Sequence, residues 1–343
     1  MRSSITNADP LHLLHPWITS TALNLVSLCC ALSVHADSQP PKPAAAVGRP
    51  ASGQMSLVAG QTAPRPQPAQ RRARHVLLIS EDGMHPALIR EQPLPNHERL
   101  YKNGSYSFRA HTISTASTLP SHASMLSGVD AHQHGLRWNN WRPERGYIRA
   151  PTVFSLATEE GLSTSAIVGK FKLRHILPQG TVETFVRPGY YCRKVSEEAA
   201  RRIETDQPAL MFVHFSDPDE KGHSAGWLSD AQRAAARECD RCLGRILEAL
   251  DRRGTLDETL IIVSADHGGH SHGHSGILLS DIQIPWIAHG PQVRRGYAIA
   301  GRISTMDTAA TVLFALGLPT PDNLRGRAVR EIFTRSQKDL AQP

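Results

Sequence analysis

The sequence predicts an α/β fold in which helices sandwich a doubly wound, mostly parallel sheet. Apolar runs of strand length alternate with longer helical patterns from residue 75 onward. Near-continuous stretches of Val, Ile and Leu are typical of parallel strands covered on both faces. No internal repeat or second domain-sized linker interrupts the pattern, so residues 75–335 are interpreted as one domain. The predicted strands are His75–Ser80, Ser165–Gly169, Leu210–Phe215 and Leu260–Ala265.

Two helices carry clear end signals. The longer one is predicted over Ser229–Arg253, because Ser229 and Gln232 form a capping box and Gly254 can end the helix. The second spans Thr308–Leu316 and is also followed by a glycine. These elements supply the covering layers of the sheet.

Three cysteines lie in the predicted domain, at positions 192, 239 and 242. Cys239 and Cys242 fall on the apolar face of the long helix, which favours core packing over a redox or metal pair. An exported chain permits disulfides, and with three cysteines at least one thiol stays unpaired within the chain.

Residues 1–36 have the pattern of a secretory signal peptide. Arg2 precedes an apolar stretch from Trp17 to Val34, and Val34-His35-Ala36 has the small-x-small form of a cleavage site. An uncleaved anchor is the alternative. We therefore expect a periplasmic or secreted protein with no stable membrane span after cleavage. Residues 37–74 are rich in Pro, Ala, Gly and Gln and are predicted to be a disordered linker, and residues 336–343 a tail.

The net charge of +7 does not predict a nucleic-acid-binding face. Residues 1–74 hold 7 Lys and Arg against 2 Asp, a balance of +5, so the rest of the chain carries only +2. A partner recognised by a strongly basic surface is therefore not implied. The sequence predicts no oligomeric state.

Polar clusters follow three predicted strands, at the point where each strand ends. They are Glu81-Asp82-Gly83, the segment Asp217–His223 and the segment Asp266–His274. The carboxyl ends of parallel strands meet at one edge of a sheet, so we expect these side chains to lie together. Mixed carboxylates and imidazoles favour zinc, whereas calcium and magnesium prefer oxygen ligands alone. Each residue taken singly could instead be a helix cap, a turn residue or part of a solvated loop.

Thr118 is the candidate nucleophile. It lies in Thr118-Leu119-Pro120-Ser121-His122, where Pro120 suits the first turn of a helix that runs to about Ser127. Thr118 would then lie just ahead of a helix N-terminus, where free N–H groups and the dipole favour negative charge. A metal-held hydroxyl at that place can attack phosphorus. An ordinary Thr or Ser helix cap is the alternative.

In this order the motifs resemble the alkaline phosphatase superfamily, most closely its type I phosphodiesterase/nucleotide pyrophosphatase and sulfatase-like branches. The resemblance covers roughly residues 75–335 and implies that superfamily's α/β fold. The matching residues are Asp82 for the first metal Asp, Thr118 for the diesterase nucleophile, Asp219 and His223 for the Asp-x-x-x-His pair, Asp266-His267-Gly268 for the Asp-His-Gly motif, and His274 for the final His ligand.

The resemblance implies two divalent metal ions, zinc being favoured, and a small-molecule phosphate ester as substrate. In line with it, Thr118 would attack phosphorus to form a phosphothreonine, which water would then resolve. The implied ligands are Asp219, His223 and His274 for one ion, and Asp82, Asp266, His267 and Thr118 for the other.

Two further matches concern substrate binding. Asn139 lies 21 residues after Thr118, where diesterases of this superfamily carry an Asn that binds a non-bridging phosphate oxygen. Lys170, in Gly169-Lys170-Phe171, is similar to the Lys of the Gly-Lys-Trp motif that contacts nucleophile and sulfate in sulfatases. The alternatives are a turn residue for Asn139 and a surface lysine for Lys170.

Departures from these patterns refine the prediction. A sulfatase uses a Cys or Ser that is converted to formylglycine, whereas this chain has Thr118 with His122 and His267, which argues against sulfatase activity. A sulfatase-like or phosphonate ester hydrolase is kept as the alternative enzyme. Ser121 replaces the diesterase Asn, which places nucleotide pyrophosphatase specificity in question. A different class of function is a His-rich metal-binding protein without catalysis, centred on the segment 267–274. His270 and His272 are expected to be loop residues or outer supports.

Overall fold

The computed structural model describes residues 71–274 and 276–334, and all structural statements below refer to these residues. The predicted signal peptide at 1–36, most of the predicted linker at 37–74 and the predicted tail at 336–343 lie outside them. Residues 71–74 are described, and they pack on the domain: Ala73 is buried, and the N–H groups of Arg72 and Ala73 donate to the carbonyl of Ala315. The folded part thus includes the last residues assigned to the linker.

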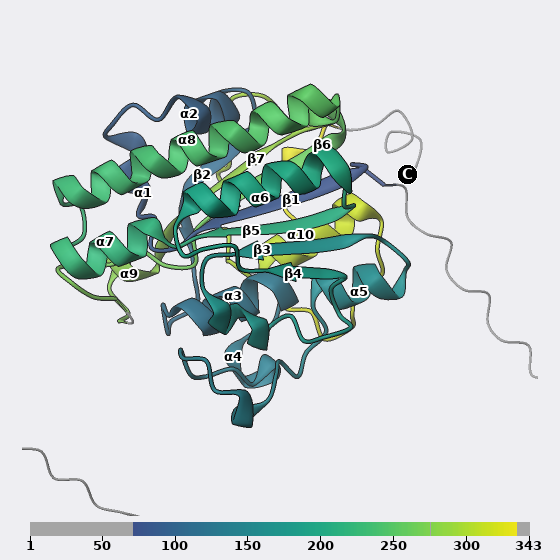
Figure 1. The fold of residues 1–343 in the computed structure, drawn as a ribbon, viewed down its shortest axis with the longest axis horizontal. Coiled ribbons are helices and arrows are strands. Elements are labelled where there is room, and N and C mark those ends of the chain that lie inside the picture. The colour runs from purple at the N-terminus through teal and green to yellow at the C-terminus, as the bar shows by residue number, and fades with distance from the viewer. Residues whose placement is uncertain (1–70, 275, 335–343) are drawn as a thin grey trace, which may run out of the picture. The chain divides into compact units, whose positions relative to one another are not determined.

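An eight-stranded sheet forms the centre of the described chain, in the order β4-β3-β5-β1-β6-β7-β2-β8 (Figure 1). Strands β4, β3, β5, β1 and β6 are parallel, whereas β7 runs antiparallel to both of its neighbours, β6 and β2. The mostly parallel, doubly wound sheet predicted from the sequence is confirmed. The strands are β1 His75–Glu81, β2 Ser105–His111, β3 Thr164–Val168, β4 Thr184–Val186, β5 Leu210–Phe215, β6 Thr259–Ser264, β7 Gln283–His289 and β8 Tyr297–Ala298.

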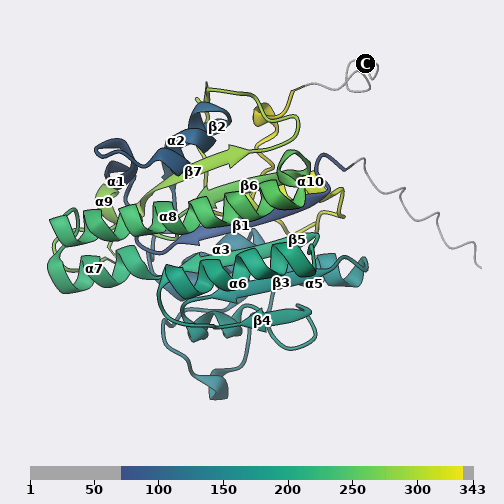
Figure 2. The same cartoon turned by 45° about the horizontal axis from the view of Figure 1, so that its top comes forward.

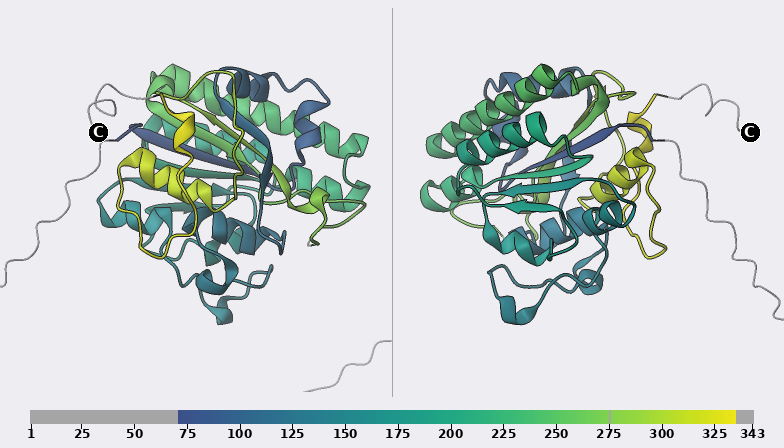
Figure 3. Two further views of the ribbon diagram at one scale, coloured as in Figure 1. Left: turned by 180° about the vertical axis from the view of Figure 1, so that it is seen from behind. Right: turned by 45° about the vertical axis from the view of Figure 1, so that its right-hand side comes forward.

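Helices cover both faces of the sheet. Helices α6, α7 and α8 lie on one face, and α3, α5 and α10 lie on the other (Figures 1 and 2). From behind, the yellow helix α10 is seen crossing this second face (Figure 3, left). The helices are α1 Pro86–Arg90, α2 Pro95–Lys102, α3 Thr118–Ser127, α4 Ala131–His134, α5 Val153–Glu159, α6 Cys192–Thr205, α7 Asp217–Ala225, α8 Asp230–Arg253, α9 Leu279–Ile282 and α10 Asp307–Leu316, with 3-10 turns η1 Pro143–Arg145, η2 Phe171–His175, η3 Leu256–Glu258 and η4 Arg330–Ile332.

The predicted helix ends agree with the structure to within one or two residues. The Ser229 side chain accepts the N–H of Gln232 at the start of α8, and Gly254 ends it in the left-handed region at φ 72°. The side-chain Oε1 atom of Gln232 accepts the N–H of Leu228, whereas a capping box would have it accept the N–H of Ser229. One boundary differs: α3 begins at Thr118, so Thr118 lies in its first turn rather than ahead of it.

The register of the central strands explains where the polar clusters meet. β1 pairs in parallel with both β5 and β6, so that Glu81 lies opposite Phe215 and Ser80 lies opposite Ser264. These strands are buried along almost their whole length, which matches their apolar sequences. Their carboxyl ends therefore deliver the residues that follow to the same edge of the sheet.

A disulfide joins α6 to α8, between Cys192 and Cys242. The interpretation of Cys242 as a packing thiol was therefore wrong: it lies on the buried face of α8, but α6 brings Cys192 within bonding reach, which a helical pattern cannot show. Cys239 is the buried free thiol, as the count of three cysteines required. Its pKa is raised well above the usual value by burial, so it stays protonated and inert.

Within the described ranges, no helix is long and apolar enough to cross a membrane.

Candidate metal centre

The residues predicted as metal ligands form two compact groups at the carboxyl edge of the sheet. In the first group, Asp219 and His223 lie four residues apart on α7, and His274 joins them from the loop after β6. In the second group, Asp82 follows β1, and Asp266 and His267 follow β6. Within each group the potential ligand atoms lie within 4.8 Å of one another. Three strand ends therefore meet as the sequence predicted.

The two groups lie against each other. The Nε2 atom of His267 is 3.4 Å from Asp82 Oδ1, 3.3 Å from Asp266 Oδ2 and 3.8 Å from Asp219 Oδ1, which belongs to the other group. The rings of His267 and His274 stack with their centroids 3.7 Å apart. One continuous centre thus results from the two ligand sets.

Each of the three histidines has its Nδ1 atom fixed by a backbone carbonyl. His267 Nδ1 lies 2.9 Å from the Gly268 oxygen, His274 Nδ1 lies 2.6 Å from the Ala116 oxygen, and His223 Nδ1 lies 2.9 Å from the His272 oxygen. A carbonyl can only accept, so Nδ1 must carry the proton and the Nε2 atom of a neutral ring presents a lone pair. This is the usual tautomer of a histidine that binds a metal through Nε2.

Buried acceptor atoms without hydrogen bonds also indicate that cations bind here. Four such atoms are buried and have no hydrogen-bond partner among the residues that the structure describes: Asp82 Oδ1, Asp219 Oδ1, Asp266 Oδ2 and His267 Nε2. Burying such groups unpaired is costly, and here several acceptors face one another. A divalent cation in each group satisfies them, so the residues present fit two such ions.

Lys170 lies between the two groups at the end of β3. Its ammonium contacts Asp82 Oδ2 at 2.7 Å and Asp219 Oδ2 at 2.5 Å, one carboxylate from each group. Burial alone would raise the pKa of Asp82, but the Lys170 ammonium, the hydrogen bond from His214 and the nearby His267 ring hold that pKa well below its usual value. Both carboxylates are therefore kept ionised and able to bind a cation.

The protonation of His267 depends on the charges around it. Burial lowers its pKa, but Asp266, Asp82 and Asp219 outweigh burial and raise the pKa to about 9. The pKa of His274 is instead lowered to about 4, by burial and by the neighbouring His267. A cation that binds His267 must displace its proton, so binding should release protons.

Thr118 is 1% exposed and lies at the N-terminal end of α3. The N-cap residue of α3 is Ser117 rather than Thr118, and the Ser117 side chain makes no cap hydrogen bond to the helix. The simple helix-cap alternative is therefore not what this structure contains. Two residues earlier, Ala116 adopts φ 27°, a strained conformation for a residue with a side chain, and its carbonyl is the one held by His274.

Asn139 is held close to the start of α3. Its Oδ1 atom accepts the backbone N–H of Leu119 at 2.9 Å and the Lys172 ammonium at 3.0 Å. Because both donors use Oδ1, the amide nitrogen is the atom left to contact a ligand beside Thr118. The predicted substrate residue Asn139 thus lies next to Thr118, the predicted nucleophile, and Lys172 is a neighbour that the sequence motifs did not identify.

Gly83 explains how tightly the first strand end approaches α7. It has φ 71°, and a Cβ atom placed on it would lie 2.9 Å from the Cα atom of Asp219. Its N–H donates to Asp266 Oδ1 at 3.1 Å. The glycine after Asp82 is therefore required by both its backbone conformation and the packing of the centre.

Two further histidines at the centre were given no role in the sequence analysis, His214 and His122. His214 Nε2 lies 2.9 Å from Asp82 Oδ2, and His122 contacts the Thr118 carbonyl through Nδ1 and Ser80 Oγ through Nε2. His214 is the one polar residue in the otherwise apolar, fully buried strand β5, and that interruption is the signal the sequence offers. His122 lies one turn after Thr118, so helical spacing could have identified it.

His270 and His272 lie outside the two ligand groups. His270 Nδ1 contacts Asp281 Oδ1 at 2.6 Å, and His272 Nδ1 faces the carbonyl of His223 at 3.1 Å. They support the loop after β6, which is the outer role expected for them.

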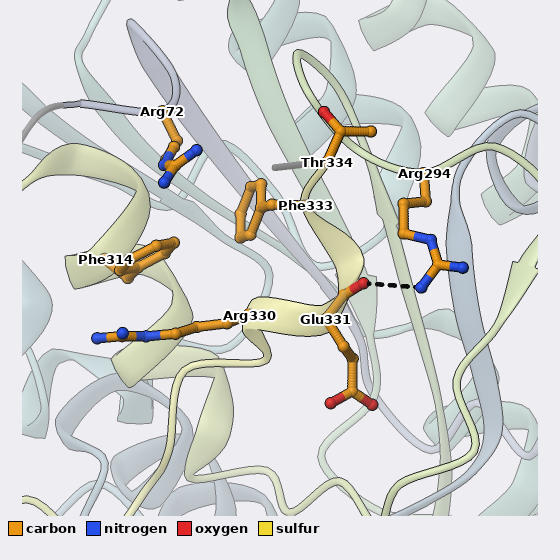
Figure 4. Close-up of a pocket in the computed structure, with 7 residues that line it drawn as sticks. All are labelled: Arg72, Arg294, Phe314, Arg330, Glu331, Phe333 and Thr334. Carbon is orange, nitrogen blue, oxygen red and sulfur yellow. Dashed lines mark hydrogen bonds between the residues drawn. The ribbon is translucent and has the colours of Figure 1, made fainter. Parts of the chain in front are cut away.

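A cavity of about 740 Å³ lies at a different place, around the start of β1 and the end of the described chain (Figure 4). Figure 4 shows the Phe314 ring between Arg72 and Arg330, whose guanidinium carbons lie 5.5 and 4.7 Å from its centroid. None of the predicted site residues lines it. Since Arg72 precedes β1 and Asp82 follows it, the strand separates this cavity from the metal centre. The lining residues are Arg72, Arg294, Phe314, Arg330, Glu331, Phe333 and Thr334.

The sheet and the ligand groups at its carboxyl edge define an α/β protein of the alkaline phosphatase superfamily. Within it, the chain belongs to the type I phosphodiesterase / nucleotide pyrophosphatase family, whose sequence profile matches residues 76–282, or 207 of the 343 residues.

Solved structures share this fold. Murine ectonucleotide pyrophosphatase/phosphodiesterase 5 aligns with a TM-score of 0.64 at 15% identity, over 76% of this chain and 100% of its own. A 2-O GAG sulfatase aligns with a TM-score of 0.65 at 14% identity, over 78% of this chain and 75% of its own. At such low identities the likeness concerns the fold alone.

Curated relatives include 2,3-bisphosphoglycerate-independent phosphoglycerate mutases. The protein from Gloeobacter violaceus is 27% identical over 228 residues, which cover 60% of this chain and 38% of the relative. The protein from Desulforudis audaxviator is 32% identical over 166 residues, 46% of this chain and 30% of the relative. The matched regions thus span only 30–38% of the length of these relatives.

Proposed function

We propose that this protein is a two-metal hydrolase of phosphate esters that works through a phosphothreonine on Thr118. The observation that carries the proposal is the pair of adjoining ligand groups whose orphaned acceptors face one another beside the start of α3. Family membership and the phosphate chemistry named for the relatives support the same reaction class. Zinc is the favoured metal because each group combines carboxylates with imidazole.

Bound divalent cations would supply Lewis-acid stabilisation of the phosphoryl oxygens and lower the pKa of the Thr118 hydroxyl. Asp219, His223 and His274 would hold one cation, and Asp82, Asp266 and His267 the other, with the Thr118 oxygen as a further ligand. Lys170, now between Asp82 and Asp219, could then turn toward a phosphoryl oxygen.

The other residues of the site prepare the reaction without a separate general base. The N-terminal turn of α3 favours negative charge at Thr118 and on the phosphoryl group. Asn139 presents its amide nitrogen to a non-bridging oxygen, because Leu119 and Lys172 occupy its Oδ1 atom. The Thr118 oxygen, its proton lost to solvent, attacks phosphorus while the bond to the ester oxygen breaks and the leaving alcohol takes up a proton. Water then attacks phosphorus, the bond to Thr118 breaks and its hydroxyl is restored, which releases phosphate from a monoester or a phosphate monoester from a diester.

The proposed substrate is a small phosphate ester in the compartment to which the protein is exported. An inactive variant of the murine neighbour was solved with AMP, which shows that a nucleotide fits that protein's site and makes nucleotides a reasonable class to assay. The disulfide between Cys192 and Cys242 supports export to an oxidising compartment, the periplasm or the exterior.

The deciding experiment uses full-length protein reconstituted with zinc and assayed on 4-nitrophenyl phosphate and on bis(4-nitrophenyl) phosphate. Hydrolysis of either that disappears in Thr118→Ala supports the proposal. Absence of both activities in a protein shown to hold two metal ions would overturn it. The same assay with a 4-nitrophenyl sulfate and a phosphonate ester tests the alternative enzyme class.

A non-catalytic His-rich metal-binding protein is the alternative of a different class. It requires the segment 267–274 to bind metal on its own. His270 instead contacts Asp281 and His272 contacts the His223 carbonyl, each through Nδ1, and neither residue belongs to the two ligand groups. Metal binding that survives loss of both Asp82 and Asp219 would favour this alternative.

A further inference from the structure

A surface rich in arginine lies at the edge of the sheet opposite the metal centre. Two cavities of about 740 and 340 Å³ adjoin there, since Arg72 lines both, and Figure 4 shows the larger one. Arg72 precedes β1, and Arg294 follows β7, whose last residue His289 pairs with Ile261 near the start of β6. We call this surface the arginine face and define it by the arginines that line the two cavities, Arg71, Arg72, Arg74, Arg294 and Arg330.

The charges of the arginine face are only partly neutralised. Five arginines meet three carboxylates there, and one of these, Glu258, is already paired with Arg74 at 3.2 Å. Arg294 and Arg330 are in no ion pair within the described ranges. Residues 71–334 hold 32 Lys and Arg against 28 Asp and Glu, a balance of +4, so a small total charge conceals a locally basic surface. The total could not predict this surface, because its arginines come from segments far apart in the sequence.

Aromatic rings hold two of the guanidinium groups in place. The guanidinium carbon of Arg294 lies 3.5 Å from the ring centroid of Tyr297, and that of Arg330 lies 4.7 Å from the centroid of Phe314. Stacking covers one flat side of a guanidinium group and leaves its N–H edge able to bind phosphate. One edge atom, Nη1 of Arg294, contacts the carbonyl of Glu331 at 3.3 Å. These charges are therefore held at the surface before an anion binds.

The spacing of the charges favours an extended anionic surface over one small anion. Phe314 lies between Arg72 and Arg330, whose guanidinium carbons are 5.5 and 4.7 Å from its centroid (Figure 4). One phosphate group cannot contact guanidinium groups on both sides of a ring, whereas neighbouring lipid headgroups can each contact one. Basic residues near an anionic lipid surface contribute to binding separately, so the contributions add.

The course of the chain favours a bilayer as the partner. Arg71 is the first described residue, so the predicted linker joins the domain at the arginine face, and the apolar stretch Trp17–Val34 precedes the linker in the sequence. We propose that the arginine face binds the surface of an anionic phospholipid bilayer. The metal centre lies at the opposite edge of the sheet, so this contact leaves it open to substrate and directed away from the membrane.

Vesicle sedimentation tests the proposal on the exported protein, in the form in which the host processes it. Phosphatidylcholine vesicles with and without phosphatidylglycerol are compared at low salt, and the ratio of the two partition coefficients cancels any apolar insertion. That ratio should fall about 30-fold in Arg294→Gln/Arg330→Gln, at about 5-fold per arginine, and stay near the wild-type value in Arg294→Lys/Arg330→Lys. High salt should abolish the preference for phosphatidylglycerol.

The control Arg137→Gln/Arg149→Gln removes the same charge elsewhere. Both residues lie beside α4, away from the start of β1, and the N–H of Arg149 donates to the carbonyl of His134 (Figure 1). A ratio unchanged in Arg294→Gln/Arg330→Gln, or lowered equally in the control, would overturn the proposal. Binding of a single-stranded oligonucleotide without any preference between the vesicles would also overturn it, and would assign the face to a soluble polyanion.

A fluorescent label reports the contact even if the processed protein keeps an apolar anchor. Thr334→Cys places a thiol at the larger cavity, and Glu144→Cys in η1 is its control. A polarity-sensitive dye reacts there, because the other cysteines are in a disulfide or buried. Emission at position 334 should shift to the blue only with phosphatidylglycerol, whereas equal emission on both vesicles contradicts the proposal. Neither measurement requires catalysis, so both hold if the proposed hydrolase activity fails.

Discussion

His267 Nε2 lies 3.8 Å from Asp219 Oδ1, and this contact joins a ligand of one metal group to a ligand of the other. The two residues come from different strand ends, β6 and β5, so the parallel register of the sheet sets their separation. Loss of ligands from either group should therefore disturb both.

Metal content is the first prediction. Purified protein reconstituted with zinc should bind two ions per chain, because two groups of buried acceptors each require a cation. His223→Ala should reduce the content to about one, and chelation should lower the melting temperature of the wild type. Elemental analysis and thermal melts measure both effects. A wild type that binds one ion or none contradicts the two-metal arrangement.

Substitution of the nucleophile is the second prediction. Thr118→Ala should lower phosphate ester hydrolysis by roughly 10³-fold or more, since the attacking oxygen is gone. Ser117→Ala is the matched control, because the Ser117 side chain makes no cap hydrogen bond, and it should stay within a few-fold of the wild type. Acid-quench labelling with a ³²P substrate should mark Thr118. Equal activity of the two variants would exclude the threonine intermediate.

The third prediction concerns the zinc affinity of Gly83→Ala, with Gly161→Ala as its control. Both glycines have nearly the same φ, 71° and 72°, so both variants pay a similar backbone cost of about 1 kcal/mol. A Cβ at position 83 meets the Asp219 backbone at 2.9 Å, whereas one at 161 meets nothing within 4 Å. Gly83→Ala alone should weaken zinc affinity. Comparable zinc affinity in both variants would mean that the close approach at Gly83 is unimportant.

The fourth prediction concerns pH and the buried His97. Its ring bridges Asp240 Oδ1 at 2.7 Å and Glu81 Oε2 at 2.9 Å. Burial lowers the pKa of His97, but the two carboxylates outweigh it and raise the pKa to about 10. Because the folded pKa exceeds the unfolded value of 6.5, the stabilisation is full below about pH 6.5 and is lost as pH rises toward 10.

Urea unfolding between pH 6.5 and pH 10 measures this effect. The unfolding free energy of the wild type should decline across that window by on the order of a few kcal/mol more than that of His97→Gln. Parallel declines in the two proteins would show that His97 is not the titrating group.

Reduction of the disulfide is the fifth prediction. The Cys192–Cys242 bond closes a 50-residue separation, so its loss should cost about 4 kcal/mol in a chain-entropy account. Melting with and without a reductant, and of Cys192→Ser, measures the loss. Cys239→Ser should still melt at a lower temperature when the reductant is added, because Cys239 is the free buried thiol and the disulfide is intact in this variant. Identical melting of oxidised and reduced wild type would refute a stabilising disulfide.

Much of this centre could be predicted because it depends on sequence order. Asp82, Asp219 and Asp266 each follow an apolar run, and parallel strands bring such positions to one edge without knowledge of any side-chain conformation. The i, i+4 spacing of Asp219 and His223 on α7 is likewise visible in the sequence.

Contacts between distant segments could not be predicted in this way. The approach of Cys192 to Cys242 depends on how α6 packs on α8, and the contact of Lys172 with Asn139 depends on two irregular loops. His97 reaches Glu81 and Asp240 only after α2 and α8 have docked on the sheet. Local periodicity carries no information about these tertiary arrangements.

The strained Ala116 carbonyl, held by His274 at 2.6 Å, connects a cation ligand to the loop that ends in Thr118. Rotation of the His274 ring would release that carbonyl and allow the loop to relax. Metal binding at the centre and positioning of the Thr118 hydroxyl should consequently be coupled. A protein that lacks the ion at His274 should therefore be less active as well as less stable.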